Sequence, residues 1–356
     1  MTLAVRYVSA RTLDTAVVQA PEPGPGEVEL APAFVGICGT DLHIFHGDMD
    51  ARVSAPAVLG HEMSGRIVRV GAGVEGWEPG DAVTVMPLRW DDTCPACRAG
   101  HQHICQHLDF IGIDSPGAMQ QRWTVPASTL IRLPDSVPLE RAALVEPTAV
   151  AVHDVGRAEV TDGEKVVVVG GGPVGILIAL VARAQGAEVR VVELSAHRRL
   201  LAEQLGLATW DPAAVDVPEM VGQWTADAGA DVAFEVSGAA GGVDTAVDVL
   251  GVRGRLCLVA IHPRPREVNL HRFFWRELTL VGARLYERCD FEKAVALVAD
   301  GTIPVERLIS KVVPLTQAPA AFEALEGGGD VMKILVDCTD DSTETDTTTD
   351  TEGVAV

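Results

Sequence analysis

The sequence has 356 residues, 47% of them hydrophobic and 22% charged, which is long enough for two domains and too apolar for a disordered chain. Acidic residues (50) outnumber lysine and arginine (28), so the formal net charge is -22 at pH 7. Nucleic-acid phosphates and anionic membrane surfaces repel such a protein, and we exclude both as partners.

The sequence carries no signal for export or for a membrane-spanning helix. The longest uncharged run, 166–182, contains three consecutive glycines and a proline, which break a single spanning helix. Residues 1–13 lack an apolar core followed by a small-residue cleavage site. We therefore expect a cytoplasmic protein, in whose reducing environment three cysteines crowded between 94 and 105 indicate metal binding rather than disulfides.

The first 147 residues predict a β-rich domain. Short valine and isoleucine runs are cut by glycine and proline throughout this part, as in RIVRVGAGVEGWEPGDAVTVMP at 66–87. Such runs are typical of short strands joined by turns.

Two segments of this domain carry side chains that bind metals. The segment GICGTDLHIFHG places a cysteine, a threonine, an aspartate and two histidines in what we expect to be one loop, and GHEMSG supplies a histidine and a glutamate on another. Thiolate, imidazole and carboxylate together suit a zinc site with an open position. The residues are Cys38, Thr40, Asp41, His43 and His46 in the first segment, and His61 and Glu62 in the second.

The segment after residue 161 predicts a nucleotide-binding unit. An apolar run at 165–169 is followed by the pattern G-x-G-x-x-G at 170–175 and then by a helical stretch. In this context the glycines form a tight turn, admit a pyrophosphate close to the backbone and let helix and strand pack together. The backbone N–H groups at the helix start attract an anion locally, despite the negative charge of the whole chain. We assign cofactor binding to Gly170, Gly172, Pro173, Val174 and Gly175.

Glu193 follows the next apolar strand and predicts which nicotinamide cofactor binds. Its carboxylate is placed to accept hydrogen bonds from ribose hydroxyls and to repel a 2′-phosphate, which favours NAD over NADP. Three nearby bases, His197, Arg198 and Arg199, offer the alternative of clamping that phosphate.

The remaining chain predicts a doubly wound parallel sheet and a return to the first domain. We expect further strands at 231–236, 255–260 and 278–282, a helix at 243–250, and about six strands in this sheet. Beyond Arg284 come a helix, a strand at 311–315, another helix and a last strand at 332–338. The tail, 339–356, is acidic and without periodicity, and we expect it to be disordered.

Several of these motifs, in this order, resemble the zinc-containing medium-chain dehydrogenase/reductase family. The first motif is CGTD at 38–41, and the third is the glycine pattern at 170–175. The second is the segment 60–74, which reads Gly60-His61-Glu62-x-x-Gly65-x5-Gly71-x-x-Val74. VEPTAVAVH at 145–153 is similar to the polyol branch, which includes sorbitol, butanediol and threonine dehydrogenases. The resemblance spans residues 1–338 and implies an α/β protein. A GroES-like catalytic zinc domain would comprise 1–148 and 286–338, and a Rossmann-like NAD domain 149–285.

The resemblance also implies roles at the catalytic zinc. Cys38 and His61 match the first two ligands, and either Glu62 or Glu146 completes the sphere, directly or through water. Glu146 has the alternative role of a charge at a helix N-terminus. The same match gives Thr40 and His43 to a proton relay, and Asp41 to support of a ligand. His153 is either a cofactor contact or a surface residue.

A structural zinc lobe is implied at 91–105, with one departure from the family. Where the family has four cysteines, this chain reads Asp91-x-x-Cys94-x-x-Cys97-x7-Cys105. Zinc accepts carboxylate oxygen, so we expect Asp91 to replace the first cysteine. The alternatives are Asp92, His101 or His103 in the fourth place, or a lobe that has lost its metal.

The function implied is zinc-dependent oxidation of a secondary alcohol, a vicinal diol or polyol, to a ketone by NAD, in a homodimer or homotetramer. Alternatives are a hydrophobic secondary alcohol or an amino alcohol such as threonine, a zinc-free reductase, and a non-enzymatic NAD-binding sensor. The candidate pocket residues do not single out one alcohol. They are Phe45, Trp90, Phe110, Met119 and Trp275.

Overall fold

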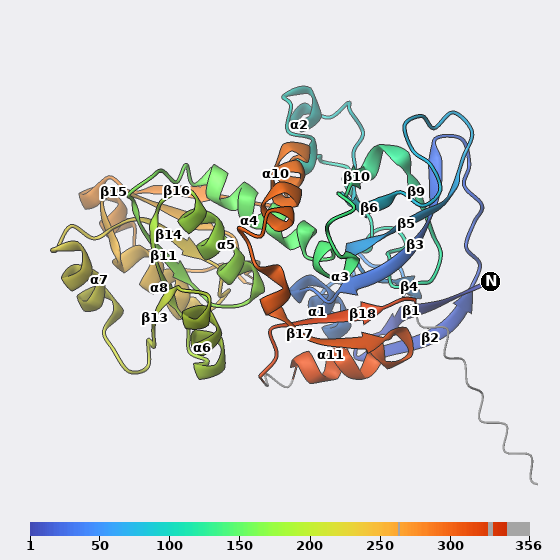
Figure 1. Ribbon diagram of the computed structural model, residues 1–356. Coiled ribbons are helices and arrows are strands. Elements are labelled where there is room, and N and C mark those ends of the chain that lie inside the picture. The colour runs from blue at the N-terminus through green and yellow to red at the C-terminus, as the bar shows by residue number, and fades with distance from the viewer. Residues whose placement is uncertain (263, 327–329, 340–356) are drawn as a thin grey trace, which may run out of the picture.

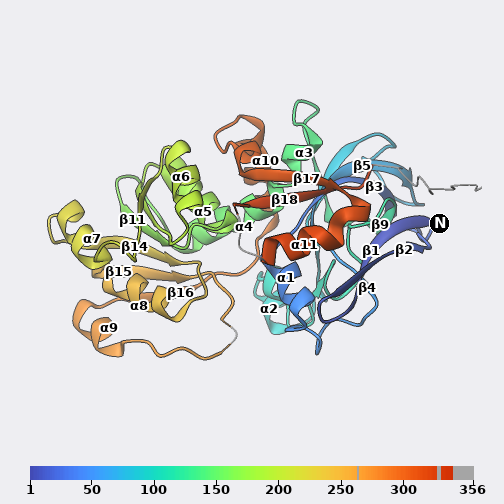
Figure 2. The same ribbon diagram turned by 90° about the horizontal axis from the view of Figure 1, so that it is seen from below.

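The computed structural model describes residues 1–262, 264–326 and 330–339 of the chain. The expected disordered tail lies outside these residues from position 340 onward. The α/β class is confirmed, because a parallel sheet flanked by helices stands beside a β-rich part (Figures 1 and 2). Within the described residues, no helix is long and apolar enough to cross a membrane.

The β-rich part is built mainly on a seven-stranded sheet. Its elements before the nucleotide-binding part are β1 (Thr2–Ser9), β2 (Thr12–Val18), β3 (Glu27–Gly36), α1 (Gly39–His46), β4 (Ala57–Val58), β5 (Glu62–Val70), β6 (Ala82–Val85), β7 (Leu88–Arg89), α2 (Pro95–Arg98), β8 (Asp109–Phe110), β9 (Trp123–Pro126), β10 (Leu130–Arg132), α3 (Leu139–Ala142) and α4 (Val145–Arg157).

The end of the chain completes this sheet. The later elements are α10 (Arg288–Ala299), β17 (Ile309–Pro314), α11 (Ala318–Glu326) and β18 (Lys333–Asp337). The strand order is β10-β6-β5-β3-β18-β17, with β9 also paired to β3. Strand β18 therefore lies inside the sheet, antiparallel to β3 and parallel to β17.

The nucleotide-binding part is a six-stranded parallel sheet in the order β13-β12-β11-β14-β15-β16. This is the doubly wound order expected from the sequence. Its elements are β11 (Lys165–Val169), α5 (Pro173–Ala184), β12 (Glu188–Val192), α6 (Ala196–Gln204), β13 (Ala208–Trp210), α7 (Val217–Thr225), β14 (Ala230–Glu235), α8 (Ala240–Asp248), β15 (Leu250–Leu258), α9 (Leu270–Arg276) and β16 (Thr279–Gly282).

The apolar strand β11 lies in the middle of this sheet because both of its faces are covered. Its four valines are buried, and helices pack on either side of the sheet (Figure 1). At the turn that follows, a Cβ on Gly175 would lie 1.9 Å from the carbonyl oxygen of Gly170. Only glycine permits this close approach of helix and strand, as the sequence predicted.

Two loop assignments and one helix boundary expected from the sequence are wrong. The segment with Thr40 and His43 is the helix α1 rather than a loop, and Glu62 is the first residue of strand β5. A hydrogen bond from Cys38 N–H to the Asp41 carboxylate caps α1, and we did not anticipate this cap. The helix expected at 243–250 ends at Asp248, since β15 begins at Leu250.

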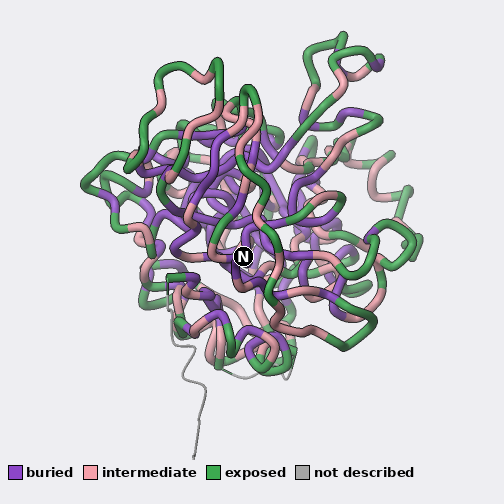
Figure 3. Tube along the Cα trace, turned by 90° about the vertical axis from the view of Figure 1, so that its right-hand side faces the viewer, coloured by how far each residue is buried: buried purple, intermediate pink, exposed green. Residues whose placement is uncertain are grey.

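Helix α4 joins the two parts of the molecule. It starts beside the β-rich sheet and packs against α5 of the nucleotide-binding part and against α10 (Figures 1 and 2). Ten of its thirteen residues are buried, Glu146 and His153 among them. Buried segments fill the interior of the molecule, and exposed ones form its outer loops (Figure 3).

Candidate active site and metal centres

The first candidate metal centre forms where β3 ends and β5 begins. The two strands pair so that Gly36 lies opposite Glu62. This register brings Cys38, which follows β3, next to His61 and Glu62. One ligand atom from each of the three side chains lies within 4.8 Å of the others, and both His61 and Glu62 are buried. The structure thus brings together residues from two separate sequence motifs.

Asp41 supports this centre from helix α1. One carboxylate oxygen accepts the Cys38 N–H at 2.9 Å, and the other faces His61 Nδ1 at 3.6 Å. Neither that second oxygen nor His61 Nδ1 has a hydrogen-bond partner among the described residues. Burial lowers the pKa of His61, but the nearby acidic groups, Asp41 first, outweigh burial and raise it.

Glu146 lies beside the three side chains and is held by a tyrosine. Its Oε1 accepts a hydrogen bond of 2.8 Å from the Tyr286 hydroxyl, and both residues are buried. Burial, with a contribution from Glu62, raises the pKa of Glu146 to about 7. Glu146 is therefore a carboxyl group that ionises near neutral pH, and a cation bound beside it would lower its pKa.

Lys333 of β18 forms a buried ion pair with Glu62. Its Nζ lies 2.8 and 2.7 Å from the two carboxylate oxygens and 3.1 Å from the carbonyl oxygen of Ile37. Burial lowers the pKa of Lys333, but the charges of Glu62 and Cys38 outweigh burial and raise it overall. Lys333 thus stays charged and fixes the position of Glu62.

The donor set and the charge balance fit a zinc ion. Thiol, imidazole and carboxylate groups converge, and zinc in proteins prefers these ligands. Around the cluster, side chains that can carry a negative charge outnumber the two that can carry a positive one, His61 and Lys333, and burying such an excess is costly without a cation. The acidic groups are Cys38, Asp41, Glu62 and Glu146.

The expected proton-relay residues lie on α1 next to the centre. Thr40 and His43 are three residues apart on this helix, so they share one face. Both are partly exposed, and His43 Nδ1 lies 3.2 Å from the Asp48 carboxylate. That contact directs the other ring nitrogen of His43 away from Asp48.

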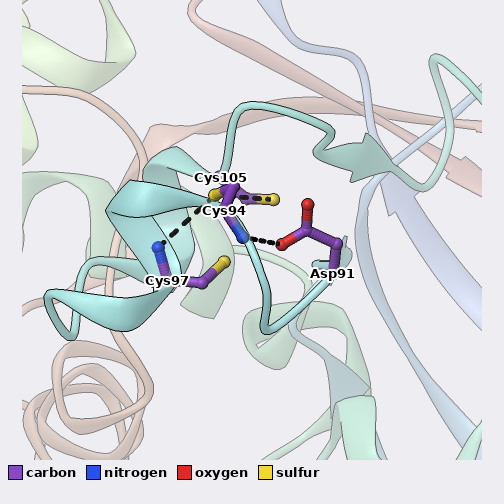
Figure 4. A group of neighbouring side chains, drawn as sticks. All are labelled: Asp91, Cys94, Cys97 and Cys105. Atoms are coloured by element: carbon purple, nitrogen blue, oxygen red, sulfur yellow. Dashed lines mark hydrogen bonds between the residues drawn. The ribbon is translucent and has the colours of Figure 1, made fainter.

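The second candidate centre unites Asp91 with three buried cysteines. One ligand atom from each of the four side chains lies within 4.8 Å of the others (Figure 4). Backbone N–H groups of residues 97, 106 and 107 donate to the sulfurs of Cys94 and Cys105. The bonds from the N–H groups of Cys97 and Gln106 lower the pKa of Cys94 to about 7, whereas burial raises that of Cys97 to about 12.

Asp91, rather than the alternatives, faces the cysteines. Its Oδ1 accepts N–H groups of Thr93 and Cys94 at 2.8 and 2.9 Å, and its Oδ2 lies 2.5 Å from His107 Nδ1. The group that converges among the described residues does not include Asp92, His101 or His103. His107 therefore orients the carboxylate from outside the cluster, a contact that we did not foresee.

The cofactor residues expected from the glycine pattern lie at the carboxyl end of β11. Gly170 has a positive φ of 108°, and α5 begins at Pro173 with Val174 partly exposed beside it. Glu193 reaches this turn, because its two carboxylate oxygens accept the N–H groups of Gly171 and Ser195, both at 2.7 Å. Each oxygen keeps a second acceptor site for a ribose hydroxyl.

The three bases near Glu193 differ in whether they are free to bind a 2′-phosphate. Arg199 donates to two backbone carbonyls and pairs with Asp211 at 2.8 Å, so it is already engaged. His197 faces Asp330 at 3.7 Å. Arg198 approaches the turn, with a guanidinium nitrogen 3.9 Å from the position of a Cβ on Gly172.

The surface alternative for His153 is wrong, whereas the expected pocket residues lie in different environments. His153 is neither on the surface nor free, since it is 6% exposed and its Nδ1 contacts Asp290 at 2.8 Å. Of the expected pocket residues, Phe110 does lie beside the centre, with its ring 5.1 Å from that of His61. Met119 is fully buried, and Trp275 is exposed on α9.

Tyr286 and Lys333 are the two site residues that sequence reasoning missed. Both contact a glutamate from a distant part of the chain. One signal for Lys333 was present, because it is the single charge in the otherwise apolar run at 332–336. No comparable local signal marks Tyr286.

Comparison with known families and relatives agrees with this geometry. The alcohol dehydrogenase GroES-like domain matches residues 24–135, and the zinc-binding dehydrogenase family matches residues 173–300. A 2-dehydro-3-deoxy-L-galactonate 5-dehydrogenase of Pseudoalteromonas atlantica is 48% identical over 94% of this chain and 98% of its own length. The sorbitol dehydrogenase of Halalkalibacterium halodurans is 31% identical over 90% and 95%. The L-galactonate-5-dehydrogenase of Escherichia coli K12 is 33% identical over 85% and 89%.

Solved structures show the same fold. The 2R,3R-butanediol dehydrogenase of Bacillus subtilis is 30% identical, with a TM-score of 0.88 over 95% of this chain and 99% of that one. A zinc-binding dehydrogenase of Sinorhizobium meliloti bound to NADP is 32% identical, with a TM-score of 0.90 over the same shares. Together with the sequence matches, these likenesses establish that the chain is an oxidoreductase of the zinc-containing medium-chain dehydrogenase/reductase family, in its polyol branch.

Proposed function

We propose that this protein oxidises a secondary alcohol of a polyhydroxylated substrate to a ketone, with hydride transfer to NAD. The convergence of Cys38 with the buried side chains of His61 and Glu62 carries the proposal. The relatives support it, because their names describe the oxidation of a sugar alcohol and of two galactonates, which are polyhydroxylated acids.

Cys38, His61 and Glu62 would hold the zinc in this reaction. When bound, zinc supplies a Lewis acid that lowers the pKa of the substrate hydroxyl. The nicotinamide ring would take up the hydride from the substrate carbon, and the substrate hydroxyl would lose a proton. Thr40 and His43 accept and pass on that proton toward solvent, since they share one face of α1 and are partly exposed.

We assign the direct carboxylate contact to Glu62 rather than to Glu146. One of its oxygens lies within 4.8 Å of the ligand atoms of Cys38 and His61, and each oxygen still has an acceptor site beside the Lys333 hydrogen bond. Glu146 then stays nearby in the hydrogen bond from Tyr286 and is available as a further, exchangeable ligand.

The substrate class can be tested with a panel of alcohols. Catalytic efficiency with NAD should be higher on a four- to six-carbon polyol or on 2,3-butanediol than on 2-butanol, because a second hydroxyl can chelate an open zinc site and orient the reacting carbon. If 2-butanol or a primary alcohol is the best of the panel, the preference for polyhydroxylated substrates is wrong.

NAD preference is expected to depend on Glu193. Its carboxylate occupies the turn at Gly171 and would repel a 2′-phosphate. Glu193→Ala should therefore lower the ratio of kcat/KM with NAD to kcat/KM with NADP by roughly tenfold. Asp231→Ala, on the opposite end of the sheet, is the control. A wild-type enzyme that favours NADP would move the specificity to Arg198.

The Asp91 cluster is proposed to bind a structural zinc. Asp91→Ala should remove one zinc per chain and lower the melting temperature, while kcat per folded molecule stays unchanged because the cluster lies apart from Cys38 and His61. Zinc analysis and calorimetry measure the effect. A zinc content that Asp91→Ala leaves unaltered would mean that the lobe holds no metal. We also propose a location in the cytoplasm, whose reducing environment would keep these thiols available as metal ligands.

We further propose that residues 149–285 form a nucleotide-binding domain, which interrupts a catalytic domain of residues 1–148 and 286–338. We also propose that two copies of the chain form a homodimer through β16 of the nucleotide-binding domain. Strand β16 is an edge strand, and Leu280 on it is 47% exposed. The neighbouring helix α9 (Figure 2) carries Phe274 and Trp275, which are 76% and 67% exposed. A second copy can pair with this edge by twofold symmetry and cover these rings. Leu280→Lys should give monomers in sedimentation velocity, and an unchanged mass would reject this interface.

A further inference from the structure

The loop that follows β8 lies directly against the catalytic centre. Phe110, the last residue of β8, packs edge-on against His61, with 5.1 Å between the ring centroids. Two residues later, a Cβ on Gly112 would lie only 2.6 Å from the carbonyl oxygen of Gly60, the residue before His61. This packing fixes the loop, and with it Asp114, at the edge of the proposed substrate site.

Asp114 is already fully engaged by its own neighbours. Arg52 forms a two-pronged ion pair with it, at 2.7 and 2.6 Å, and Phe110 N–H donates to it at 2.8 Å. Burial raises the pKa of Asp114, but Arg52 and the N–H group of Phe110 outweigh burial and lower it. The carboxylate therefore stays ionised and its charge is balanced by Arg52.

Arg284 approaches the same place from the nucleotide-binding part. It follows β16, whose end is fixed by a hydrogen bond of 3.0 Å from Ala283 N–H to the carbonyl oxygen of Leu258. Two residues after Arg284, the Tyr286 hydroxyl reaches Glu146. Arg284 thus stands at the carboxyl end of the parallel sheet, where ligands of such sheets bind, and beside the catalytic centre.

Within the described part of the chain, the guanidinium of Arg284 makes neither a hydrogen bond nor an ion pair. Arg284 is exposed to solvent. Partial burial and the charge of Arg52 nevertheless lower the pKa of Arg284, and the smaller effect of Asp114 raises it. An arginine that is partly desolvated, repelled by a second arginine and left without an acceptor is suited to bind an anion that arrives from outside.

We propose that Arg284 binds a carboxylate at one end of the substrate, so that the substrates of this enzyme are sugar acids oxidised at a hydroxyl distant from the acid group. The assignment rests on the proposed function, because the hydroxyl must reach the centre formed by Cys38 and His61. The substrate would then be held at both ends, which fixes the carbon that loses the hydride.

The local charge favours a carboxylate over a phosphate ester. The ion pair between Arg52 and Asp114 is neutral, so Arg284 leaves one positive charge in this group. A carboxylate neutralises that charge, whereas a phosphate monoester, which carries nearly two negative charges at pH 7, leaves an excess of negative charge beside Asp114. An uncharged polyol leaves Arg284 without a partner.

Three compounds with the same carbon chain test the assignment: L-galactonate, galactitol and galactitol 1-phosphate. The wild-type enzyme, Arg284→Gln and the control Arg253→Gln are compared. Arg253 is an exposed arginine paired with Glu277, so its loss changes the net charge equally. The first measurement is kcat/KM with NAD. The second is calorimetric titration of each compound into the complex of holoenzyme with NADH, in which no turnover occurs.

We expect Arg284→Gln to weaken binding of L-galactonate, and to lower its kcat/KM through KM, by roughly ten- to a hundredfold. Values for galactitol should remain unchanged, as should all values for Arg253→Gln. Equal losses for galactitol, or no loss for L-galactonate, would overturn the assignment. A loss confined to galactitol 1-phosphate would replace the carboxylate by a phosphate. If L-galactonate binds through Arg284 but no compound is oxidised, the proposed function is wrong and the binding assignment stands.

Discussion

Cys38→Ser should abolish most of the activity and remove one zinc ion per chain. The cysteine supplies one of only a few side chains that converge with His61 and Glu62, and serine is a weaker zinc ligand than thiolate. Loss of Lewis-acid stabilisation worth several kcal/mol corresponds to a decrease in kcat/KM of about a thousandfold or more. Zinc analysis and steady-state kinetics measure the two effects.

A second cysteine serves as the control for this substitution. Cys289 is exposed on α10 and belongs to neither metal group, so Cys289→Ser should keep the zinc content and the activity of the wild type. If Cys38→Ser retains both zinc ions and its activity, the assignment of the catalytic centre to β3 and β5 is wrong.

Lys333→Met should destabilise the zinc-depleted protein by about 3 to 5 kcal/mol. The substitution leaves Glu62, which is 1% exposed, as a buried charge without its partner, and breaking such a pair carries this cost. Urea unfolding measures the change. Adding Glu62→Gln to Lys333→Met should recover most of the loss, because the uncompensated charge is removed.

The effect of Lys333 can be compared with that of a surface pair. Lys165 forms an ion pair with Glu188, and the two side chains are 28% and 55% exposed. Lys165→Met should therefore cost about 1 kcal/mol or less. Similar losses for Lys333→Met and Lys165→Met would mean that water reaches Glu62 and that Lys333 does not stabilise the site.

The nucleotide-binding part could be predicted well from the sequence because its signals are local. The valine run of β11, the glycines after it and Glu193 follow one another within thirty residues, and each restricts the backbone directly. The error at Leu250 has the same origin, since apolar residues continue from α8 into β15 without a break in the pattern.

Helix α1 shows where local signals were insufficient. Gly39 and Thr40 are poor helix formers, so the segment reads as a loop. The hydrogen bond between Cys38 N–H and Asp41 offsets this weakness. Burial of Ile44 and Phe45 stabilises the helix further. Tertiary packing thus decides the local conformation.

The site was predictable as far as its motifs extend. Cys38, His61 and Glu62 each lie in a short recognisable segment, and the structure brings them together. Their partners Tyr286 and Lys333 were not predictable in this way, because the hydrogen bonds join residues 140 and 271 positions apart. Sequence spacing contains no information about pairs so far separated.

The position of β18 has a consequence for the way the protein is synthesised. The strand lies between β3 and β17 and delivers Lys333 to Glu62, yet it leaves the ribosome after nearly all other elements. Until then the growing chain exposes an edge of β3, and Glu62 lacks its counter-charge. The nucleotide-binding part contains all of its own strands and can fold earlier. We therefore expect the catalytic part to be the last to fold and the one that depends most on chaperones during translation.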